Sequence, residues 1–324
     1  MGEMLTPGRQ GHKRISREGS RLHPTREGIE WAAAERDCPD LMEKKKRNSK
    51  PPAGGPTTSA RRRRLGQHFL RDEGITTRIM TRFAPGPQDR VLEVGPGPGA
   101  LTDHLAGTVA RLIAVELDKT LADRLCRRFA DVPSVTIVQG DILDMDWNEL
   151  LDGVEGNSRC RLLGNLPYSV ATPIMLRALQ RGDLFSDLMV MVQREVAWRL
   201  LAGPGGGDYG PLAVLVTLLC RDARLILEVP PGAFSPPPQV QSAVVALALD
   251  PVVPTPAVTA GIALARRAFM QRRKKLVNTL AGPAPRMVAG ALEKLSLNTN
   301  ARPEEIRPED YVRLAQVLNT LETR

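Results

Sequence analysis

Cysteine is scarce in this sequence, and long apolar runs are missing. The 324 residues include only four cysteines, which lie far apart and form no Cys-x-x-Cys pair. Such spacing excludes a disulfide framework and a zinc motif, so we expect reduced thiols, a cytoplasmic protein and no bound metal. No apolar run reaches the roughly 18 residues of a membrane-spanning helix, and the amino terminus lacks the apolar segment of a signal peptide. We therefore expect no membrane association.

Positive charge is unevenly distributed along the chain. The formal net charge is +9, yet residues 1–64 contain sixteen Lys and Arg against eight Asp and Glu, which amounts to +8 and leaves +1 for the remainder. These residues show no sustained apolar period and include a Pro/Gly-rich stretch over 51–56. We predict that residues 1–64 are a disordered basic extension. It is either an arm that attracts RNA or the product of a misassigned start codon.

From residue 65 onward, short apolar runs alternate with segments of helical period, such as 101–106 and 121–129. The apolar runs are rich in β-forming residues and cover 91–94, 112–115, 135–138, 162–163 and 188–192. This alternation predicts an α/β fold in which helices cover both faces of a parallel sheet. Two further runs, 223–229 and 240–249, are joined by a Pro-rich loop too short for a crossover helix. They predict an antiparallel pair that closes the sheet.

The pattern becomes purely helical beyond residue 256. Helical periods cover 257–270, 272–280, 284–295 and 308–321. We expect these segments to form a small all-α domain. The predicted organisation is therefore the basic extension (1–64), an α/β domain (65–252) and a helical domain (253–324).

A glycine-rich turn is expected where the first strand meets the first helix. Residues 93–102 read Glu-Val-Gly-Pro-Gly-Pro-Gly-Ala-Leu-Thr, which places Gly95 and Gly97 at the carboxyl edge of the sheet. Glycines let the backbone approach a ligand closely, and the following helix adds the positive end of its dipole. Such a turn alone is weak evidence for a nucleotide cofactor.

Two acidic residues and two prolines narrow the class of cofactor. Glu116 closes the second strand, 21 residues after Gly95, at about the distance where an acidic side chain binds a ribose. Asp141 closes the third strand, and its carboxylate is suited to accept from an adenine amine. Pro96 and Pro98 remove backbone donors that a pyrophosphate would need. A cofactor with adenosine and no phosphate is therefore predicted, and S-adenosylmethionine matches best.

A second turn, over residues 161–173, follows the fourth strand. Pro167 and Pro173 cannot continue a strand ladder or a helix interior. Asn165 and Tyr168 are therefore expected on a stiff turn at the ligand-binding edge of the sheet. An amide and an aromatic ring suit a flat, hydrogen-bonding substrate such as a nucleobase. An ordinary turn with a packed tyrosine is the alternative.

Together the two turns predict methyl transfer to an adenine amine, whose lone pair is delocalised into the ring. Asn165 Oδ1 and the Leu166 carbonyl are expected to accept the amine protons, which localises that lone pair. Tyr168 and Phe234 are expected to sandwich the base. Because the methyl donor is cationic and leaves as a neutral group, no strong general base is required. His104, on the first helix, is accordingly expected at the surface.

Eight stretches carry a family resemblance: Gln-His-Phe-Leu at 67–70, the glycine turn at 93–102, Val-Glu-Leu-Asp at 115–118, Asn-Leu-Pro-Tyr-Ser-Val-Ala-Thr-Pro-Ile at 165–174, Met-Val-Gln-Arg-Glu-Val-Ala at 191–197, Asp-Tyr-Gly at 208–210, Phe-Ser-Pro-Pro-Pro-Gln-Val at 234–240 and Arg-Arg-Lys-Lys-Leu-Val-Asn at 272–278. In order and spacing they resemble the ribosomal RNA adenine dimethyltransferases, most closely the KsgA-like small-subunit branch. The resemblance implies a class I (Rossmann-like) methyltransferase sheet with a small C-terminal all-α domain that contacts RNA.

The resemblance also implies a reaction and a set of contacts. The reaction is dimethylation of N6 on two adjacent adenosines in the 3′-terminal hairpin loop of small-subunit (16S) ribosomal RNA, within the pre-30S particle. The implied contacts to S-adenosylmethionine come from His68 and Leu70 in an amino-terminal lid, Gly95, Glu116 at the ribose, Asp141 at the adenine, and Asn165 between donor and target amine. The family usually has Asn or His at position 68. Nothing in the match accounts for residues 1–64, and the lack of a leftover apolar helix face predicts a monomer.

Three other functions stay open at this point. A large-subunit adenine methyltransferase of the macrolide-resistance type shares the chemistry, but the stretches at 191–197 and 272–278 look more like the small-subunit branch. A non-enzymatic nucleic-acid-binding factor on this fold is disfavoured by the intact cofactor and target residues. A nicotinamide dehydrogenase leaves the Asn-Leu-Pro-Tyr turn without a role.

Basic clusters indicate where RNA would bind outside the turns. They comprise Arg124, Arg127 and Arg128, then Arg266 and Arg267, then residues 272–275. Residues 271–275 are expected to open a helix beside the cleft, which favours phosphate contacts over simple solvation. The glycine-rich residues 203–209 are either a mobile lip of the RNA groove or a plain surface loop.

Overall fold

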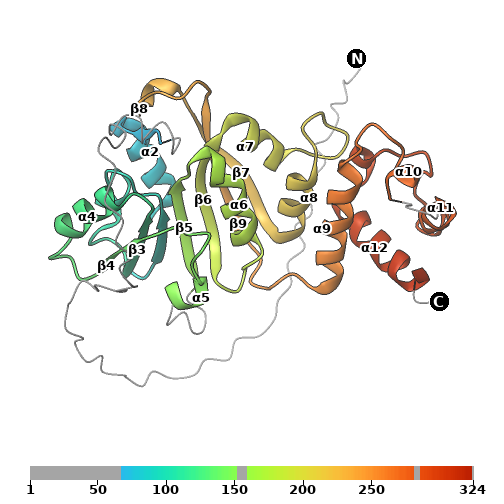
Figure 1. The fold of residues 1–324 in the computed structure, drawn as a ribbon, viewed down its shortest axis with the longest axis horizontal. Coiled ribbons are helices and arrows are strands. Elements are labelled where there is room, and N and C mark those ends of the chain that lie inside the picture. The colour runs from blue at the N-terminus through green and yellow to red at the C-terminus, as the bar shows by residue number, and fades with distance from the viewer. Residues whose placement is uncertain (1–66, 152–158, 281–284, 323–324) are drawn as a thin grey trace, which may run out of the picture. The chain divides into compact units, whose positions relative to one another are not determined.

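The computed structural model describes residues 67–151, 159–280 and 285–322. The predicted basic extension over residues 1–64 lies outside the described residues. A seven-stranded sheet forms the centre of the fold (Figure 1). Its strands follow the spatial order β4 (Val135–Gln139), β3 (Arg111–Glu116), β2 (Arg90–Val94), β5 (Cys160–Asn165), β6 (Phe185–Gln193), β9 (Ser242–Leu249) and β7 (Cys220–Val229).

The strand pairing agrees with the sequence pattern. The first five strands along this sheet, β2 to β6, are parallel to one another, as predicted. The predicted antiparallel pair is also confirmed, because β7 pairs with β9 along most of its length. β9 lies between β6 and β7 and is antiparallel to both. The pair closes one edge of the sheet.

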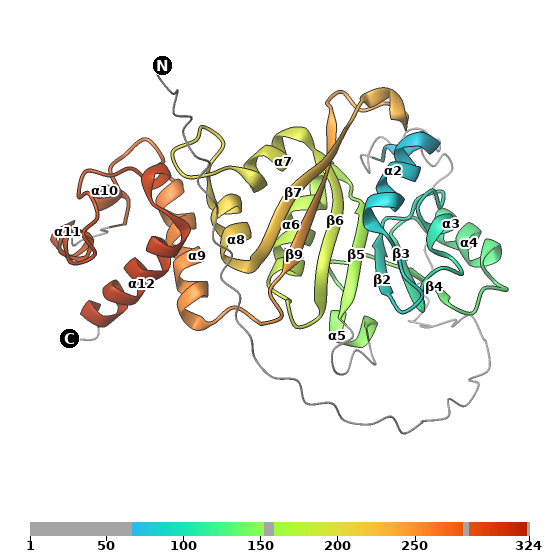
Figure 2. The ribbon, with the colours of Figure 1, turned by 180° about the vertical axis from the view of Figure 1, so that it is seen from behind.

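Helices cover both faces of the sheet, as the alternation predicted (Figures 1 and 2). Val91 in β2 packs in a core cluster with α2 (Glu73–Phe83), whereas the next residue, Leu92, packs in a second cluster with α6 (Tyr168–Leu179). Successive side chains of a strand point to opposite faces, so a run that is apolar at every position requires cover on both. The remaining helices of this region are α3 (Thr102–Leu105), α4 (Lys119–Arg128), α5 (Trp147–Leu150), α7 (Arg194–Leu201) and α8 (Pro211–Leu219).

The helix α6 corrects one expectation. Pro173 was predicted to be incompatible with a helix interior, yet it is the sixth residue of α6. Proline there removes the hydrogen bond to the carbonyl four residues earlier. The apolar face of the helix offsets this loss, because Ala171, Ile174 and Met175 are fully buried against the sheet. Tyr168 is consequently the first residue of a helix and not part of an isolated turn.

A small second sheet joins two segments that are distant in sequence. β1 (Phe69–Leu70) pairs antiparallel with β8 (Phe234–Ser235), which follows the short 3₁₀ turn η1 (Pro231–Ala233). The backbone amides of Arg71 and Asp72 extend this link by donating to the Ala233 carbonyl. The sequence pattern did not predict this pair. The two strands and the flanking residues 67, 68, 71 and 72 are called the lid below.

Four helices follow the sheet: α9 (Pro256–Phe269), α10 (Leu276–Leu280), α11 (Pro285–Lys294) and α12 (Pro308–Glu322), with the 3₁₀ turn η2 (Pro303–Glu305) before α12. They share a third core cluster, in which Tyr209, Ala213 and Val214 also take part. The predicted domain boundary after residue 252 stays a prediction. Across the ranges that the structure describes, no helix is both long and apolar enough to span a membrane.

The order of the strands fixes where a ligand can bind. The chain runs outward from β2 through β3 to β4, and then returns to the opposite side of β2 to form β5. The loops after β2 and β5 therefore leave the sheet in opposite directions and open a crevice at the carboxyl ends of these strands.

Candidate active site

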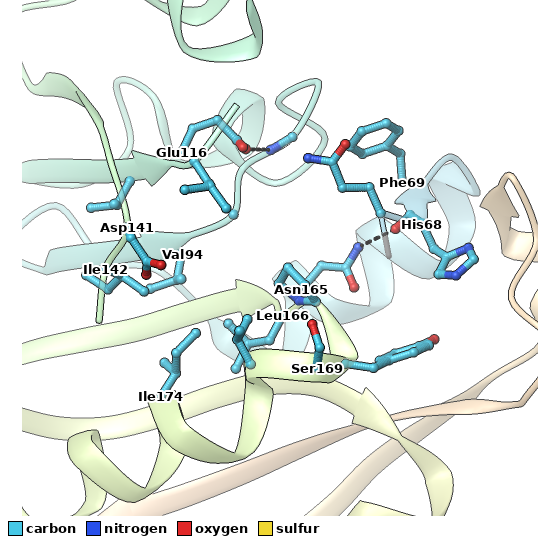
Figure 3. A pocket seen from close by; sticks show the side chains of 18 of the residues that line it. His68, Phe69, Val94, Glu116, Asp141, Ile142, Asn165, Leu166, Ser169 and Ile174 are labelled. Atoms are coloured by element: carbon cyan, nitrogen blue, oxygen red, sulfur yellow. Dashed lines mark hydrogen bonds between the residues drawn. The ribbon is translucent and has the colours of Figure 1, made fainter. Parts of the chain in front are cut away.

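A cavity lies in this crevice, and loops from four parallel strands contribute to it (Figure 3). The structure brings eight of the ten predicted site residues to its lining: His68, Gly95, Gly97, Glu116, Asp141, Asn165, Leu166 and Tyr168. Residues Val94, Ile142 and Ile174 add apolar walls. The lining is mainly apolar with a few polar groups, as in most small-molecule sites.

The glycine turn after β2 needs glycine for two separate reasons. Gly95 and Gly97 have positive φ angles of 70° and 59°, a region that favours glycine. Gly97 is also in close contact with the lid, because a Cβ atom there would lie 2.9 Å from the Phe69 ring. The backbone amide of Gly95 donates to the Val115 carbonyl at 3.0 Å. The turn is thus held between β3 and the lid.

Glu116 bridges the loops after β2 and β3 (Figure 3). Its Oε2 accepts from the Gly97 amide at 3.0 Å, and its Oε1 accepts from the Asp118 amide at 2.8 Å. Burial raises the pKa of the Glu116 carboxyl, and these backbone hydrogen bonds oppose the shift. Each carboxylate oxygen can accept more than one hydrogen bond, so capacity remains for the two hydroxyls of a ribose.

Asp141 lies at the opposite wall of the cavity from the lid. Its Oδ1 accepts from the Leu143 amide at 2.9 Å, while Oδ2 accepts no hydrogen bond from the part of the chain that the structure describes. Its carboxylate is therefore available to an exocyclic amine, as the sequence analysis proposed.

The loop that carries Asp141 is fixed by a residue that the sequence analysis missed. Arg177, near the end of α6, donates to the carbonyls of Ile142, Leu143 and Met145 at 3.1, 2.9 and 2.6 Å. Its guanidinium also lies 4.3 Å above the Trp147 ring. Nothing in the local sequence pattern indicates this role, because the contacts join segments more than 30 residues apart.

Asn165, at the end of β5, faces both the lid and the cavity. Its Nδ2 donates to the His68 carbonyl at 3.0 Å (Figure 3). This hydrogen bond fixes the orientation of the amide and directs Oδ1 away from the lid carbonyl. Oδ1 is therefore an acceptor available to a substrate, as expected for a group that binds an amine.

Tyr168 presents its ring beside His68. The two rings are stacked, with centroids 5.8 Å apart and planes 29° from parallel. The Tyr168 hydroxyl is hydrogen-bonded to the Oγ of Ser242, a fully buried residue at the start of β9, at 2.6 Å. Burial raises the pKa of Tyr168, and the Ser242 hydrogen bond opposes the shift. The tyrosine is thus anchored at its tip and half-exposed at its ring.

Two predicted site residues do not reach the cavity. Leu70 and Phe234 are paired across the lid, and both are almost fully buried, at 5% and 4% exposure. Their side chains belong to the core cluster beneath α2. Leu70 does line a small hollow beside Gly95 and Asn165. In this structure Phe234 therefore supports the lid and does not face the place of a target base, which corrects the expected position of its ring.

Glu93 is an unusual residue behind the glycine turn. It is 1% exposed, and burial raises its pKa to about 8. Its Oε2 lacks a hydrogen-bond partner within the described ranges, and the residue lines the same small hollow as Leu70. The carboxyl is therefore protonated over most of the neutral pH range.

The basic run at residues 271–275 differs from its expected geometry. It does not open a helix, because α10 begins only at Leu276. Arg272 instead donates to the carbonyls of Gly206 and Gly207, at 3.0 and 2.6 Å, and so fixes the glycine-rich loop. The argument from a helix amino terminus therefore does not apply. Arg273 and Lys274 remain exposed, whereas Arg272 has a structural contact.

The lining of the cavity fits a phosphate-free adenosyl donor. It contains the carboxylates of Glu116 and Asp141 but no Lys or Arg among the residues that the structure describes. A pyrophosphate would face two carboxylates here without a compensating cation, whereas a donor with a cationic sulfur would be favoured. Within the same residues, no group of three or more His, Cys, Asp or Glu is arranged to hold a metal ion.

Comparison with known proteins finds relatives over most of the chain. The family model for "Ribosomal RNA adenine dimethylase" matches residues 58–320. A ribosomal RNA small subunit methyltransferase A from Pseudomonas fluorescens is 43% identical over 257 residues, covering 79% of this chain and 93% of the relative. The protein of the same name from Methylococcus capsulatus is 39% identical and covers 79% of this chain and 97% of the relative.

Solved structures show the same fold. A dimethyladenosine transferase from Plasmodium falciparum superposes with a TM-score of 0.67 at 22% identity, covering 78% of this chain and 98% of that one. The 23S rRNA methyltransferase ErmE has a TM-score of 0.58 at 25% identity, covering 78% and 99%. These likenesses confirm the predicted methyltransferase sheet. With the family match and the identities above, the chain belongs to the ribosomal RNA adenine dimethylase family.

Proposed function

We propose that this chain transfers methyl groups from S-adenosylmethionine to N6 of two adjacent adenosines in the 3′-terminal hairpin loop of small-subunit ribosomal RNA, during assembly of the small subunit. The names of the relatives at 39–43% identity support the small subunit as the substrate. The observation that carries the proposal is the position of Asn165, which lines the same cavity as Glu116, Asp141 and Tyr168 and keeps Oδ1 uncommitted. We further propose a cytoplasmic monomer that acts on a pre-30S particle.

The donor side of the cavity is assigned by hydrogen-bonding capacity. Glu116 would accept from the ribose hydroxyls, and the free Oδ2 of Asp141 would accept from the adenine amine. Gly95 and Gly97 would let the backbone approach the amino-acid part of the donor. His68 would cover the donor from the lid.

The target side is assigned in the same way. Asn165 Oδ1 and the Leu166 carbonyl would accept the two protons of the target amine, and the Tyr168 ring would stack on the base. Acceptors at both protons concentrate electron density on the nitrogen. When bound, S-adenosylmethionine supplies a methyl on a cationic sulfur, so the N–C bond forms as the S–C bond breaks and its electron pair returns to sulfur. The surplus amine proton then leaves to water, which agrees with a site without a strong base.

A methyl-transfer assay tests this proposal. Tritiated donor is offered with unmethylated small subunits, with large subunits and with naked ribosomal RNA, and the products are digested to nucleosides. Dimethyladenosine in the small-subunit RNA supports the proposal, whereas label in large subunits only would indicate the macrolide-resistance type of enzyme. No transfer to any substrate, with RNA still bound, would indicate a binding factor. Asn165→Ala should abolish transfer and leave RNA binding intact, and transfer at the wild-type rate would refute the site assignment.

A further inference from the structure

A second hollow adjoins the donor cavity and shares Phe69 and Gly97 with it. It lies between the lid and α4 and has a volume of about 350 Å³, within the range of sites that hold small organic ligands. We call it the arginine groove, after Arg71 from the lid and Arg124 and Arg128 from α4. Its apolar surface comes from Phe69, Leu121 and Leu125.

The three arginines are not equivalent. Arg128 is held in place, because it pairs with Asp103 at 2.7 Å and contacts the Pro98 carbonyl at 3.4 Å. Arg71 and Arg124 are exposed, and neither forms an ion pair with any residue that the structure describes. Among the described residues, the guanidinium groups of Arg71 and Arg124 therefore line the groove without a carboxylate partner, whereas that of Arg128 is paired with Asp103.

The chemistry of the groove differs from that of the donor cavity. The donor cavity has carboxylates and no cation in its described lining, whereas the groove has three cations and an apolar surface. Guanidinium groups bind phosphates through paired hydrogen bonds, and an aromatic ring with two leucines suits the face of a base or ribose. The methyl donor has no phosphate that these guanidinium groups could bind. The combination fits a nucleotide.

We infer that the arginine groove binds a nucleotide next to the target adenosine, with its phosphate held by Arg71 and Arg124 and its base or sugar against Phe69. The inference rests on the proposed function, which supplies an RNA strand at the adjoining cavity. Because Phe69 and Gly97 line both spaces, a strand whose target base enters beside Asn165 would cross the lid to reach the groove. The lid would then take part in RNA binding as well as in donor binding.

The chain offers a matched control for this inference. Arg127 lies on the same helix as Arg124, is also exposed and does not line the groove. If α4 attracts RNA only through its general charge, Arg124→Ala and Arg127→Ala should weaken binding equally. If the groove holds a phosphate, Arg124→Ala should weaken RNA binding more than Arg127→Ala does.

The experiment measures RNA affinity of the full chain by salt titration, with donor affinity as a check on folding. We expect Arg71→Ala/Arg124→Ala to bind the RNA hairpin about tenfold more weakly, and the slope of log affinity against log salt to fall by roughly 0.7, as for one lost phosphate contact on a single strand. Arg127→Ala should leave the slope unchanged. Donor affinity should stay within about twofold in all variants, since no altered side chain lines the donor cavity.

A second arm locates the phosphate. Phosphates flanking the target adenosine are replaced one at a time by uncharged methylphosphonates. At one position the wild type should lose affinity while the double variant does not, because the partner is already removed. Equal effects on both proteins at every position would overturn the inference, as would equal losses in Arg124→Ala and Arg127→Ala. Methyl transfer on the same RNA separates the two proposals. If methyl groups are transferred but no methylphosphonate acts differently on the wild type and the double variant, the groove proposal alone is refuted. If such a difference is found but no methyl group is transferred, the proposed reaction alone is refuted.

Discussion

Asn165 donates from Nδ2 to the backbone carbonyl of His68 at 3.0 Å, so the residue that we propose as the acceptor for the target amine also contacts the lid. β1 is only two residues long, and the Asn165 hydrogen bond adds to its pairing with β8. The lid and the target site are therefore linked by one side chain.

Removal of this side chain should loosen the lid even without substrate. In Asn165→Ala, we expect amide hydrogen exchange in residues 67–70 to rise roughly fivefold, the effect of losing about 1 kcal/mol from one hydrogen bond. Exchange in the central strand β6 serves as the control and should not change. Unaltered exchange in the lid would show that the β1–β8 pairing alone keeps it closed.

The two parts of Tyr168 should have separable effects. Tyr168→Phe keeps the ring but leaves the buried Ser242 hydroxyl without its partner, so it should lower the free energy of unfolding by about 1–2 kcal/mol and largely preserve methyl transfer. Tyr168→Ala also removes the stacking surface and should reduce transfer by roughly 10- to 100-fold. Chemical denaturation and the transfer assay measure the two effects. A loss of transfer in Tyr168→Phe as large as in Tyr168→Ala would assign the catalytic role to the hydroxyl.

Gly97→Ala should weaken donor binding, and Gly205→Ala provides its control. Both glycines have a positive φ, so each alanine should cost about 1–2 kcal/mol of stability from backbone strain. Only at Gly97 does the added Cβ meet another group, the Phe69 ring at 2.9 Å, whereas nothing lies within 4 Å at Gly205. Equilibrium binding of the donor should therefore weaken in Gly97→Ala alone. Equal donor affinities would mean that Phe69 can move aside freely.

Glu93 should make the stability of the protein depend on pH. Its pKa is raised from 4.5 to about 8 in the folded state, so between these values the folded chain retains a proton that the unfolded chain releases. The free energy of unfolding should then fall as pH rises through this window, by up to about 1.4 kcal/mol per pH unit from this group. Glu93→Gln should remove that contribution and be the more stable protein at pH 8. Urea denaturation at several pH values measures it, and parallel curves for both proteins would contradict the assignment.

The regular sheet could be predicted because its inner strands are buried on both faces. The inner strands β2, β3 and β6 contain apolar runs that are buried at nearly every position, and this signal needs no knowledge of the partner strand. The polar groups of the site were also predictable, since Glu116, Asp141 and Asn165 stand where such runs end. Strand ends at the carboxyl edge gather automatically when the strands are parallel.

The features that could not be predicted depend on contacts between distant residues. The lid consists of two-residue strands that are too short for any periodicity, and it buries Phe234 by pairing it with Leu70. Arg177 binds carbonyls about 34 residues away, with no local signal. The start of α6 was missed because the rule that proline breaks helices outweighed the apolar face around Pro173, although burial of that face overrides it.

The helix α6 gives the site a mechanical property of its own. Its first residue, Tyr168, lines the cavity on the side proposed for the target base, and Arg177, about two and a half turns later, binds the loop that carries Asp141. One helix therefore carries groups at two walls of the cavity. A displacement of α6 would move both walls together.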